Sequence, residues 1–267
     1  MTGVSACSGS PAALAIFARL PVPGKVKTRL AASVGGDAAA SFYERMAERA
    51  FGALGRAEEV SSRTLFFSEA SEAEGIHGWL ESSGNVSMRA VAQCESRDLG
   101  DRMRDALDRA LASGGADGGS VRKAIVVGTD IPDLDETHVD AAARLLDHHD
   151  VVFGPAMDGG YYLLGVRRRD APAEACDRRE TRVASEARGA HPALFRGVPW
   201  STPTVLRDSI AAARAAGLSV APRDALPALR DIDTIEDVLE WANRAPETHA
   251  LADAARRLAN RARRRDE

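Results

Sequence analysis

The chain has few cysteines, and none is placed for a disulfide framework or a metal site. Cys7, Cys94 and Cys176 are the only three in 267 residues, and they lie far apart with no CxxC pair. This spacing excludes a disulfide-stapled secreted scaffold and a thiolate zinc site. The six histidines show no HxxxH or HExxH spacing, so zinc is not expected. A reducing cytoplasm is therefore the expected location.

Long apolar runs and an excess of positive charge are also missing. No stretch reaches the roughly 18 apolar residues of a membrane-spanning helix. The first residues, MTGVSACSGSPAA, lack the basic and apolar regions of a signal peptide. The net charge is −4 and the pI about 5.9, so no overall positive field gathers nucleic acid or an anionic membrane. We expect neither nucleic acid nor a membrane as partner.

Three common catalytic signatures are absent from the sequence. There is no GxSxG elbow, no GxxxxGK[ST] loop and no GxGxxG after a predicted strand. Serine hydrolases, P-loop NTPases and dinucleotide oxidoreductases are therefore not the leading hypotheses.

Short apolar and β-branched runs alternate with longer helical patterns. Strands are predicted at Leu14–Ala18, Thr64–Phe67, Val86–Val91, Ala124–Gly128, Val151–Phe153 and Tyr161–Val166. Helices are predicted at Asp37–Leu54, Leu99–Ala112, Thr137–Leu146, Thr202–Ala216 and Ile235–Asn243. Several strand runs lack polar alternation, which is typical of strands covered on both faces. The order predicts an α/β fold with a mostly parallel central sheet and helices on both faces.

The chain length and an apolar content of 45% suit one domain with one full core. We expect that domain over residues 12–245. Residues 1–11 and 246–267 carry little that must be buried. They are predicted to be a flexible N-terminus and an Arg/Ala-rich C-terminal helix or tail.

A basic loop follows the first predicted strand, in P21-V-P-G-K-V-K-T-R-L30. Only three of the 35 basic residues are lysines, and two of them stand here. Ligands of open α/β sheets bind beyond the carboxyl ends of the strands, where loop amides and helix N-termini favour anions. The alternative is a solvated basic turn. We favour a site for a di- or triphosphate, with Arg19, Gly24, Lys25, Lys27 and Arg29 as its residues.

An acidic residue follows the fourth predicted strand, in G128-T-D-I-P-D133. Asp130 stands just past the carboxyl end of the strand, opposite the basic loop. Carboxylate and phosphate oxygens are the ligands that Mg²⁺ and Mn²⁺ prefer. Asp130 is therefore the first predicted metal ligand. Asp133 has a structural alternative, because with Glu136 it resembles the N-cap of the next helix.

A glycine-rich turn joins two predicted strands in G154-P-A-M-D-G-G-Y-Y-L-L-G165. Asp-Gly is common in hairpin turns, which is a sufficient structural explanation. The paired Gly159 and Gly160 also allow a ligand to approach the backbone closely. Asp158 and Tyr161 would then place polar groups beside that ligand.

Two further segments carry candidate residues. In Q93-C-E-S-R-D-L-G-D-R-M103, Asp98 is a natural helix cap, and Gly100 could let a flat nucleobase lie on the backbone, beside Arg102. In R230-D-I-D-T-I-E-D-V-L239, capping by Asp233 or Thr234 explains one or two of the acidic residues. It does not require Asp231. We predict Asp231 and Asp233 as further metal ligands if they reach Asp130.

These motifs resemble one family when they are taken in order along residues 13–243. It is the bacterial family of glycosyltransferase-A-like proteins called transferase 1, associated with radical-SAM proteins, some of them linked to arsenosugar biosynthesis. The resemblance implies a nucleotide-diphospho-sugar transferase fold in a single domain. The matching segments are F17–L30, D98–M103, G128–L134, G154–G165, V198–V205 and D231–D237.

The two ends of the chain also resemble nucleotidyltransferases, including molybdenum-cofactor and phospholactate guanylyltransferases. By this resemblance Lys25, Lys27 and Arg29 hold a triphosphate. Asp130 and either Asp231 or Asp233 hold magnesium. Two departures leave the reaction class open: Ile235 stands where the late motif usually has proline, and A-R-L-P-V-P-G replaces a glycine-rich start.

Three functions follow from these residues and resemblances. The first is a glycosyltransferase that uses a nucleotide-diphosphate sugar, Mg²⁺ or Mn²⁺ and a small-molecule acceptor, with Asp158 or Asp231 as general base. The second is a nucleotidyltransferase that moves a nucleotide from a nucleoside triphosphate to a phosphorylated small molecule. The third is an inactive nucleotide-binding protein. A homodimer is compatible with each.

Overall fold

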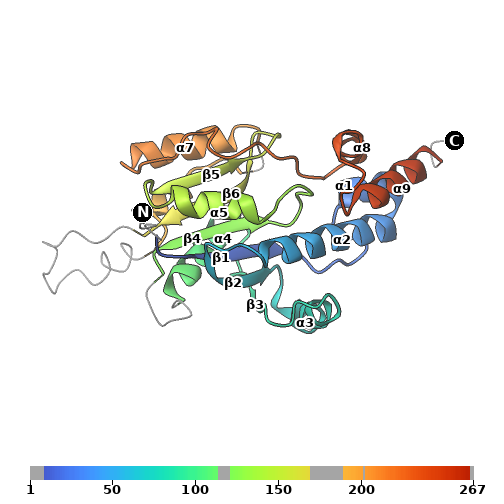
Figure 1. Ribbon diagram of the computed structural model, residues 1–267, viewed down its shortest axis with the longest axis horizontal. Helices are drawn as coiled ribbons and strands as arrows, with labels where there is room; N and C mark the ends of the chain where they lie inside the picture. The colour runs from blue at the N-terminus through green and yellow to red at the C-terminus, as the bar shows by residue number, and fades with distance from the viewer. Residues whose placement is uncertain (1–8, 114–120, 169–188, 201, 265–267) are drawn as a thin grey trace, which may run out of the picture.

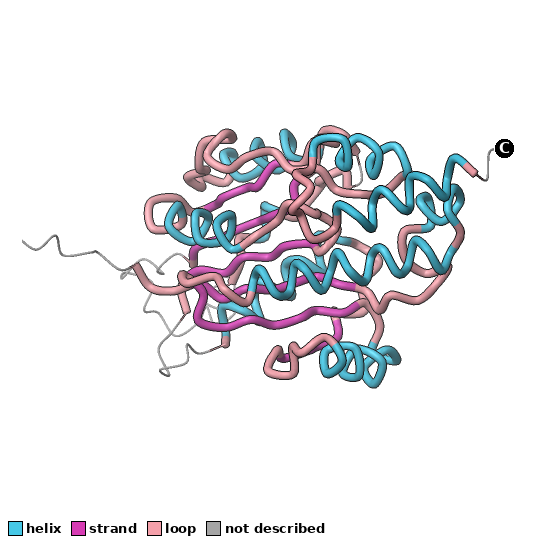
Figure 2. The backbone as a smooth tube through the Cα atoms, turned by 45° about the vertical axis from the view of Figure 1, so that its right-hand side comes forward, coloured by secondary structure: helices cyan, strands magenta, loops and turns pink. Residues whose placement is uncertain are grey.

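A sheet of six strands forms the centre of the molecule (Figures 1 and 2). The computed structural model describes residues 9–113, 121–168, 189–200 and 202–264. The strand order is β3-β2-β1-β4-β6-β5. Neighbours β3, β2, β1 and β4 pair in parallel, and β6 runs antiparallel between β4 and β5. The predicted mostly parallel sheet is confirmed. The strands are β1 (Ala12–Ala18), β2 (Val60–Phe67), β3 (Arg89–Ala92), β4 (Lys123–Gly128), β5 (Val151–Pro155) and β6 (Tyr161–Arg167).

The strands form where apolar runs can be covered from both sides. Alternate residues of β1 point to opposite faces of the sheet. Leu14 and Ile16 join one hydrophobic core, and Ala13 and Ala15 join the other. Both faces are therefore buried under helices, which explains why the strand runs lack polar alternation.

Helices cover both faces of the sheet, as predicted. Residues of α1, α2, α3, α5, α8 and α9 contribute to one core, and residues of α4 and α7 to the other. No helix in the described part of the chain is long and apolar enough to cross a membrane. The helices are α1 (Thr28–Val34), α2 (Gly36–Leu54), α3 (Ala73–Ser82), α4 (Leu99–Ala112), α5 (Glu136–Leu145), α7 (Val205–Ala215), α8 (Ile235–Arg244) and α9 (Ala252–Arg263).

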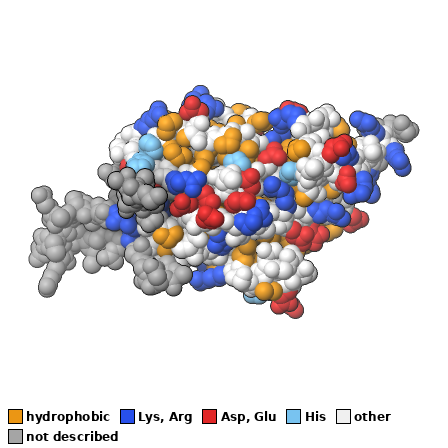
Figure 3. All heavy atoms as spheres, viewed as in Figure 1, with side chains coloured by type: hydrophobic (Ala, Val, Ile, Leu, Met, Phe, Trp, Pro, Cys, Tyr) orange, Lys and Arg blue, Asp and Glu red, His pale blue; other side chains and the backbone are white. Residues whose placement is uncertain are grey.

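The C-terminal helix α9 corrects one expectation. Residues 246–267 were predicted to carry little that must be buried, but α9 packs against α8, α1 and α2. Alanines and one leucine recur at helical spacing and form a narrow buried stripe, made of Ala252, Ala255, Leu258, Ala259 and Ala262. Arginines occupy its other face, and Figure 3 shows basic side chains gathered at this end of the molecule. Residues 1–8 of the predicted flexible N-terminus lie outside the described residues.

Three segments that are far apart in the sequence meet at one edge of the sheet. β1 and β4 pair in parallel with Phe17 opposite Gly128, so the loops after them open side by side. The chain after α7 forms isolated bridges to the β5 region at Val220 and Leu229. The backbone N–H of Ile232 then donates to the carbonyl of Asp130, at 3.0 Å. This bond joins the late acidic motif to the end of β4.

Candidate functional site

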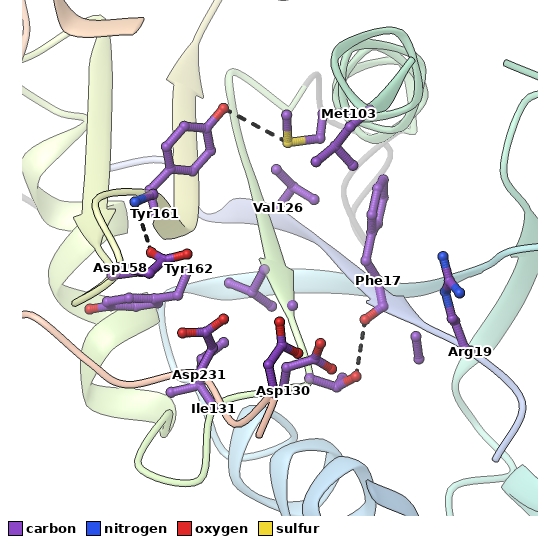
Figure 4. Close-up of a pocket in the computed structure, with 18 of the residues that line it drawn as sticks. Phe17, Arg19, Met103, Val126, Asp130, Ile131, Asp158, Tyr161, Tyr162 and Asp231 are labelled. Atoms are coloured by element: carbon purple, nitrogen blue, oxygen red, sulfur yellow. Dashed lines mark hydrogen bonds between the residues drawn. The ribbon is translucent and has the colours of Figure 1, made fainter. Parts of the chain in front are cut away.

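A cavity of about 590 Å³ opens at the carboxyl ends of β1 and β4. Its volume lies within the usual range for small-molecule sites. Figure 4 shows it with part of its lining. Most of the predicted site residues line it: Arg19, Lys25, Lys27, Arg29, Arg102, Asp130, Asp158, Gly160, Tyr161, Asp231 and Asp233. Gly24, Gly100 and Gly159 are not part of its lining.

A buried lysine bridges two carboxylates in this cavity. The Nζ of Lys27 lies 2.8 Å from Oδ2 of Asp130 and 3.0 Å from Oδ1 of Asp233. The Lys27 side chain is 4% exposed, whereas those of Asp130 and Asp233 are 44% and 45% exposed. Burial alone would lower the pKa of Lys27, but the two carboxylates outweigh burial and raise it. The ammonium group therefore stays charged.

The backbone of Lys27 has an uncommon conformation. Its φ of 47° is the one positive value at a non-glycine residue in the described part of the chain. Such left-handed backbone is uncommon for residues with a Cβ. Lys27 stands at the N-terminus of α1, and the two ion pairs accompany this conformation.

The other cations of the basic loop are more exposed. The Nζ of Lys25 lies 3.8 Å from Oε1 of Glu72, and the Lys25 side chain is 60% exposed. Arg29 lies 3.9 Å from Oδ2 of Asp233, and its side chain is 77% exposed. Phosphate binding by this loop stays a prediction, and Lys25 and Arg29 are better placed for it than Lys27.

The carboxylates of Asp130 and Asp233 suit a hard divalent cation that takes its other ligands from water and substrate. Within the described ranges, no three acidic, histidine or cysteine side chains are arranged to hold a metal. Asp130 and Asp233 nevertheless keep exposed oxygens beyond their contacts with Lys27. Mg²⁺ commonly binds one or two carboxylates and completes its coordination with water and substrate phosphates. A metal ion at Asp130 and Asp233 therefore stays a chemically suitable prediction.

A second pair of acidic residues lies in the same cavity. Figure 4 shows Asp158 and Asp231 on the same side as Asp130. The pKa of Asp231 is raised to about 6 by burial and by the neighbouring charges of Asp158 and Asp233. The Asp158 carboxylate is held in the turn by the N–H of Gly160, which donates to Oδ1 at 2.8 Å. Asp231 is thus more basic than an ordinary aspartate.

A helix cap and a side-chain hydrogen bond fix the segments next to Asp233 and Asp130. Thr234 caps α8 in a capping box with Asp237, as the sequence predicted for Asp233 or Thr234. The predicted capping role of Asp133 is wrong, because Asp135 caps α5. Asp133 instead accepts the indole N–H of Trp241, at 2.9 and 3.0 Å from its two oxygens. This bond fixes α8 to the loop that follows Asp130.

Tyr43 was not predicted, and it ties the ends of β1 and β4 together. Its hydroxyl accepts the N–H of Arg19 at 2.9 Å and lies 3.2 Å from the hydroxyl of Thr129. Thr129 donates to the carbonyl of Phe17 at 3.2 Å. Burial, and then the charge of Asp130, raise the pKa of Tyr43 to about 12. No local motif marks this residue, which sits within the apolar face of α2.

A flat ring does lie against Gly100, but it belongs to the chain itself. A Cβ at Gly100 would collide with the indole of Trp200. Trp200 lines the cavity and belongs to the segment V198–V205 that carried part of the resemblance. The nucleobase predicted on the backbone of Gly100 would therefore meet Trp200 first.

Gly159 also lies against another part of the chain and does not line the cavity. Its φ is +91°, and a Cβ there would collide with the carbonyl of Pro203. The N–H of Leu206 donates to the Gly159 carbonyl at 3.1 Å. Gly159 thus joins the β5–β6 turn to the start of α7, and of the two paired glycines it is Gly160 that lines the cavity.

Gly159→Ala is expected to lower the free energy of unfolding by roughly 2–4 kcal/mol, because it adds a clash to an unfavourable backbone conformation. Gly160→Ala is the matched control, since its Cβ would meet only the Asp158 carboxylate at 3.1 Å. Urea denaturation measures both. Equal losses would show that the Pro203 contact is not what requires glycine.

Comparison with protein families identifies the chain. Residues 53–202 match the family described as "Uncharacterized protein conserved in bacteria (DUF2064)". The chain belongs to this DUF2064 family. The matched region contains β4, Asp130 and the glycine-rich turn, and it excludes the basic loop and the late acidic motif. No curated protein sequence matches the chain.

A solved structure confirms the fold of the DUF2064 chain. It is described as a "putative nucleotide-diphospho-sugar transferase" from Desulfovibrio desulfuricans G20. The match has 27% identity and a TM-score of 0.75, and it covers 96% of this chain and 98% of the other. The predicted single-domain α/β fold of the nucleotide-diphospho-sugar transferase type is therefore confirmed. The links to radical-SAM proteins and arsenosugars stay predictions.

More distant structures match over the whole length. A cytidylyltransferase from Leptospira borgpetersenii serovar Hardjo-bovis (strain JB197) has 13% identity, a TM-score of 0.48 and coverage of 97% of this chain and 96% of its own. A nucleotidyl transferase from Methanothermobacter thermautotroptrophicus has 13% identity, a TM-score of 0.47 and coverage of 96% and 100%. These neighbours are transferases by name, and likeness this remote carries no argument about the reaction.

Proposed function

We propose that this DUF2064 protein is a metal-dependent transferase that uses a nucleotide-diphosphate sugar and a small-molecule acceptor. The observation that carries the proposal is the Lys27–Asp130–Asp233 cluster in a cavity of ligand size at the ends of β1 and β4. The description of the Desulfovibrio protein, which shares the fold over nearly its full length, supports the same class.

Each side chain has a distinct role in this proposal. Asp130 and Asp233 would hold Mg²⁺ or Mn²⁺, and such an ion neutralises charge on a departing diphosphate. The buried Lys27 forms an ion pair with each of these carboxylates and would keep them in place. Lys25 and Arg29 are exposed at the loop and would reach the phosphates as additional positive charges.

Asp231 is the proposed general base. With a pKa of about 6 it is mostly ionised at neutral pH and more basic than an ordinary aspartate. A base of this strength removes a proton from an attacking hydroxyl more effectively. Asp158 contributes by raising the pKa of Asp231 through its charge.

Nucleotidyl transfer is the second candidate. The exposed Lys25 and Arg29 could meet a nucleoside triphosphate, and an acceptor phosphate would then attack its α-phosphorus. The two reactions release different products, a nucleoside diphosphate in glycosyl transfer and pyrophosphate in nucleotidyl transfer. An inactive nucleotide-binding protein is the third candidate and would release neither.

A thermal-shift screen with Mn²⁺ against nucleotide sugars and nucleoside triphosphates tests the proposal. A ligand at 100 times its Kd adds about 2.7 kcal/mol of stability. For a domain of this size that corresponds to a rise in Tm of roughly 5–10 °C. We expect the largest rise with one nucleotide sugar, and its loss when EDTA is added. Stabilisation by a triphosphate alone would favour nucleotidyl transfer, and a rise that persists in EDTA would contradict the metal role.

A further inference from the structure

Two arginines of the cavity wall have no carboxylate partner. Arg19 directly follows β1 and Arg102 lies in the first turns of α4, and both line the cavity. Among the described residues, no carboxylate oxygen lies within 4.0 Å of either guanidinium group. The three other cations of the lining, Lys25, Lys27 and Arg29, each face an acidic residue.

Arg102 is held in place by a neutral group. Its Nη1 donates to Oε1 of Gln93 at 3.2 Å, and Nε2 of Gln93 donates to the carbonyl of Phe66 at 3.1 Å. Gln93 is buried, so its amide is fixed and orients the guanidinium without neutralising it. The Nε of Arg102 is buried and has no hydrogen-bond partner.

The two arginines lie close enough to affect each other. The pKa of Arg102 is lowered by burial and next by the charge of Arg19, while Cys94 and Asp98 act in the opposite direction to a smaller extent. Like charges kept together at a cavity wall repel, and a bound anion removes that repulsion. Guanidinium groups also offer the paired donors that suit phosphate and carboxylate.

We propose that Arg19 and Arg102 form an anion subsite that binds a phosphate or carboxylate group of the acceptor. Figure 4 shows Arg19 beyond Phe17, away from Asp130, Asp158 and Asp231. Arg19 and Arg102 were expected from the sequence to bind the donor nucleotide, but neither contacts the Lys27–Asp130–Asp233 cluster, where the donor diphosphate is assigned through its metal ion. A second anion site therefore suits a second substrate. This inference rests on the proposed function and adds that the acceptor is acidic.

The subsite has a built-in fluorescent reporter. Trp200 packs on Gly100, two residues from Arg102, and lines the cavity. The other tryptophans, Trp79 and Trp241, are 5% and 1% exposed and do not line it. Titration of the full chain with inorganic phosphate or acetate, in EDTA and without nucleotide, therefore follows the subsite through Trp200. Trp200→Phe should abolish the signal.

We expect saturable binding of phosphate, acetate or both, and the tighter of the two identifies the acceptor group. Arg102→Gln and Arg19→Gln should each weaken it roughly tenfold, the usual effect of losing a charged hydrogen-bond donor. Arg97→Gln is the matched control, because Arg97 is exposed just before α4 and does not line the cavity. Arg19 is exposed, so its variant is expected to fold normally.

Nucleotide affinity in Mn²⁺ separates this inference from the proposed function. It should change less than about twofold in Arg19→Gln and Arg102→Gln. A loss of nucleotide affinity equal to the loss of phosphate affinity would assign the pair to the donor and overturn the proposal. So would an equal effect of Arg97→Gln, or no anion binding by the wild type. Anion binding that needs the two arginines, in a protein that binds no nucleotide, would support the subsite and reject the proposed function.

Discussion

Asp130→Asn is expected to weaken binding of a manganese–nucleotide complex by roughly 100-fold or more. The metal affinity of a site typically falls 10–100-fold when a residue that hydrogen-bonds to a metal ligand is replaced. Loss of a direct ligand should lower the affinity at least as much. An amide keeps the size of the carboxylate but not the charge that a hard cation prefers. Isothermal titration with the nucleotide that gives the largest thermal shift measures the effect.

The same substitution should leave the fold intact. The Asp130 side chain is 44% exposed, and Lys27 keeps its second partner Asp233 at 3.0 Å. Loss of a half-exposed ion pair costs at most about 1 kcal/mol. Asp253→Asn, in the exposed part of α9, is the matched control and should bind nucleotide like the wild type. Unchanged affinity in Asp130→Asn would remove Asp130 from the metal site.

Lys27→Met is expected to tighten the binding of Mn²⁺ alone by about tenfold. The ammonium group lies at 2.8 and 3.0 Å from Asp130 and Asp233 and opposes a second cation there. Removing one unit charge at such short range changes the interaction by about 1–3 kcal/mol under partly solvated conditions. Methionine fills a similar volume, so the wall of the cavity is preserved.

Stability should fall in the same variant. Without Lys27, Asp130 and Asp233 lose the counter-ion they share, and only the exposed Arg29 stays near Asp233, at 3.9 Å. We expect a loss of about 1–2 kcal/mol, small because both carboxylates are nearly half exposed. Saturating Mn²⁺ should restore part of this loss. Calorimetric titration of metal and urea denaturation with and without Mn²⁺ measure the two effects. Metal affinity that does not rise would show that Lys27 does not compete with a cation.

The fold was largely predictable because its strands and most helices carry strong local patterns. The β4 run from Ala124 to Gly128 is uninterrupted and apolar. Helix α4 is capped by Asp98 and begins and ends at the predicted residues. The helix predicted from Thr202 begins at Val205 instead. Two helices were missed: α1 has seven residues, too few for a clear period, and α3 contains Gly75 and Gly78.

The sequence predicted the acidic residues of the candidate site but not how they are arranged. Asp130, Asp158, Asp231 and Asp233 were marked by their positions after strands and before a helix, and all line one cavity. The pairing of Lys27 with Asp130 and Asp233 was not predictable, since Asp233 lies 206 positions from Lys27 and the backbone of Lys27 is left-handed. Nor could the sequence show that the indole of Trp200 takes the place expected for a nucleobase at Gly100.

The distribution of cations also differs from the simplest expectation. The sequence drew attention to the basic loop because two of the three lysines stand in it. In the folded chain the buried Lys27 pairs with the carboxylates of Asp130 and Asp233. Among the described cations that line the cavity, Arg19 and Arg102 are the ones without an acidic partner. Composition marks where charge is concentrated, whereas tertiary contacts decide which charges are free for a ligand.

Anomalous diffraction from a crystal grown with Mn²⁺ and the best-binding nucleotide tests the central claim most directly. The account predicts a manganese peak bonded to the carboxylates of Asp130 and Asp233 and to the nucleotide phosphates, at the carboxyl ends of β1 and β4. A nucleotide bound in the cavity with no manganese at these carboxylates, or bound elsewhere on the molecule, would contradict it.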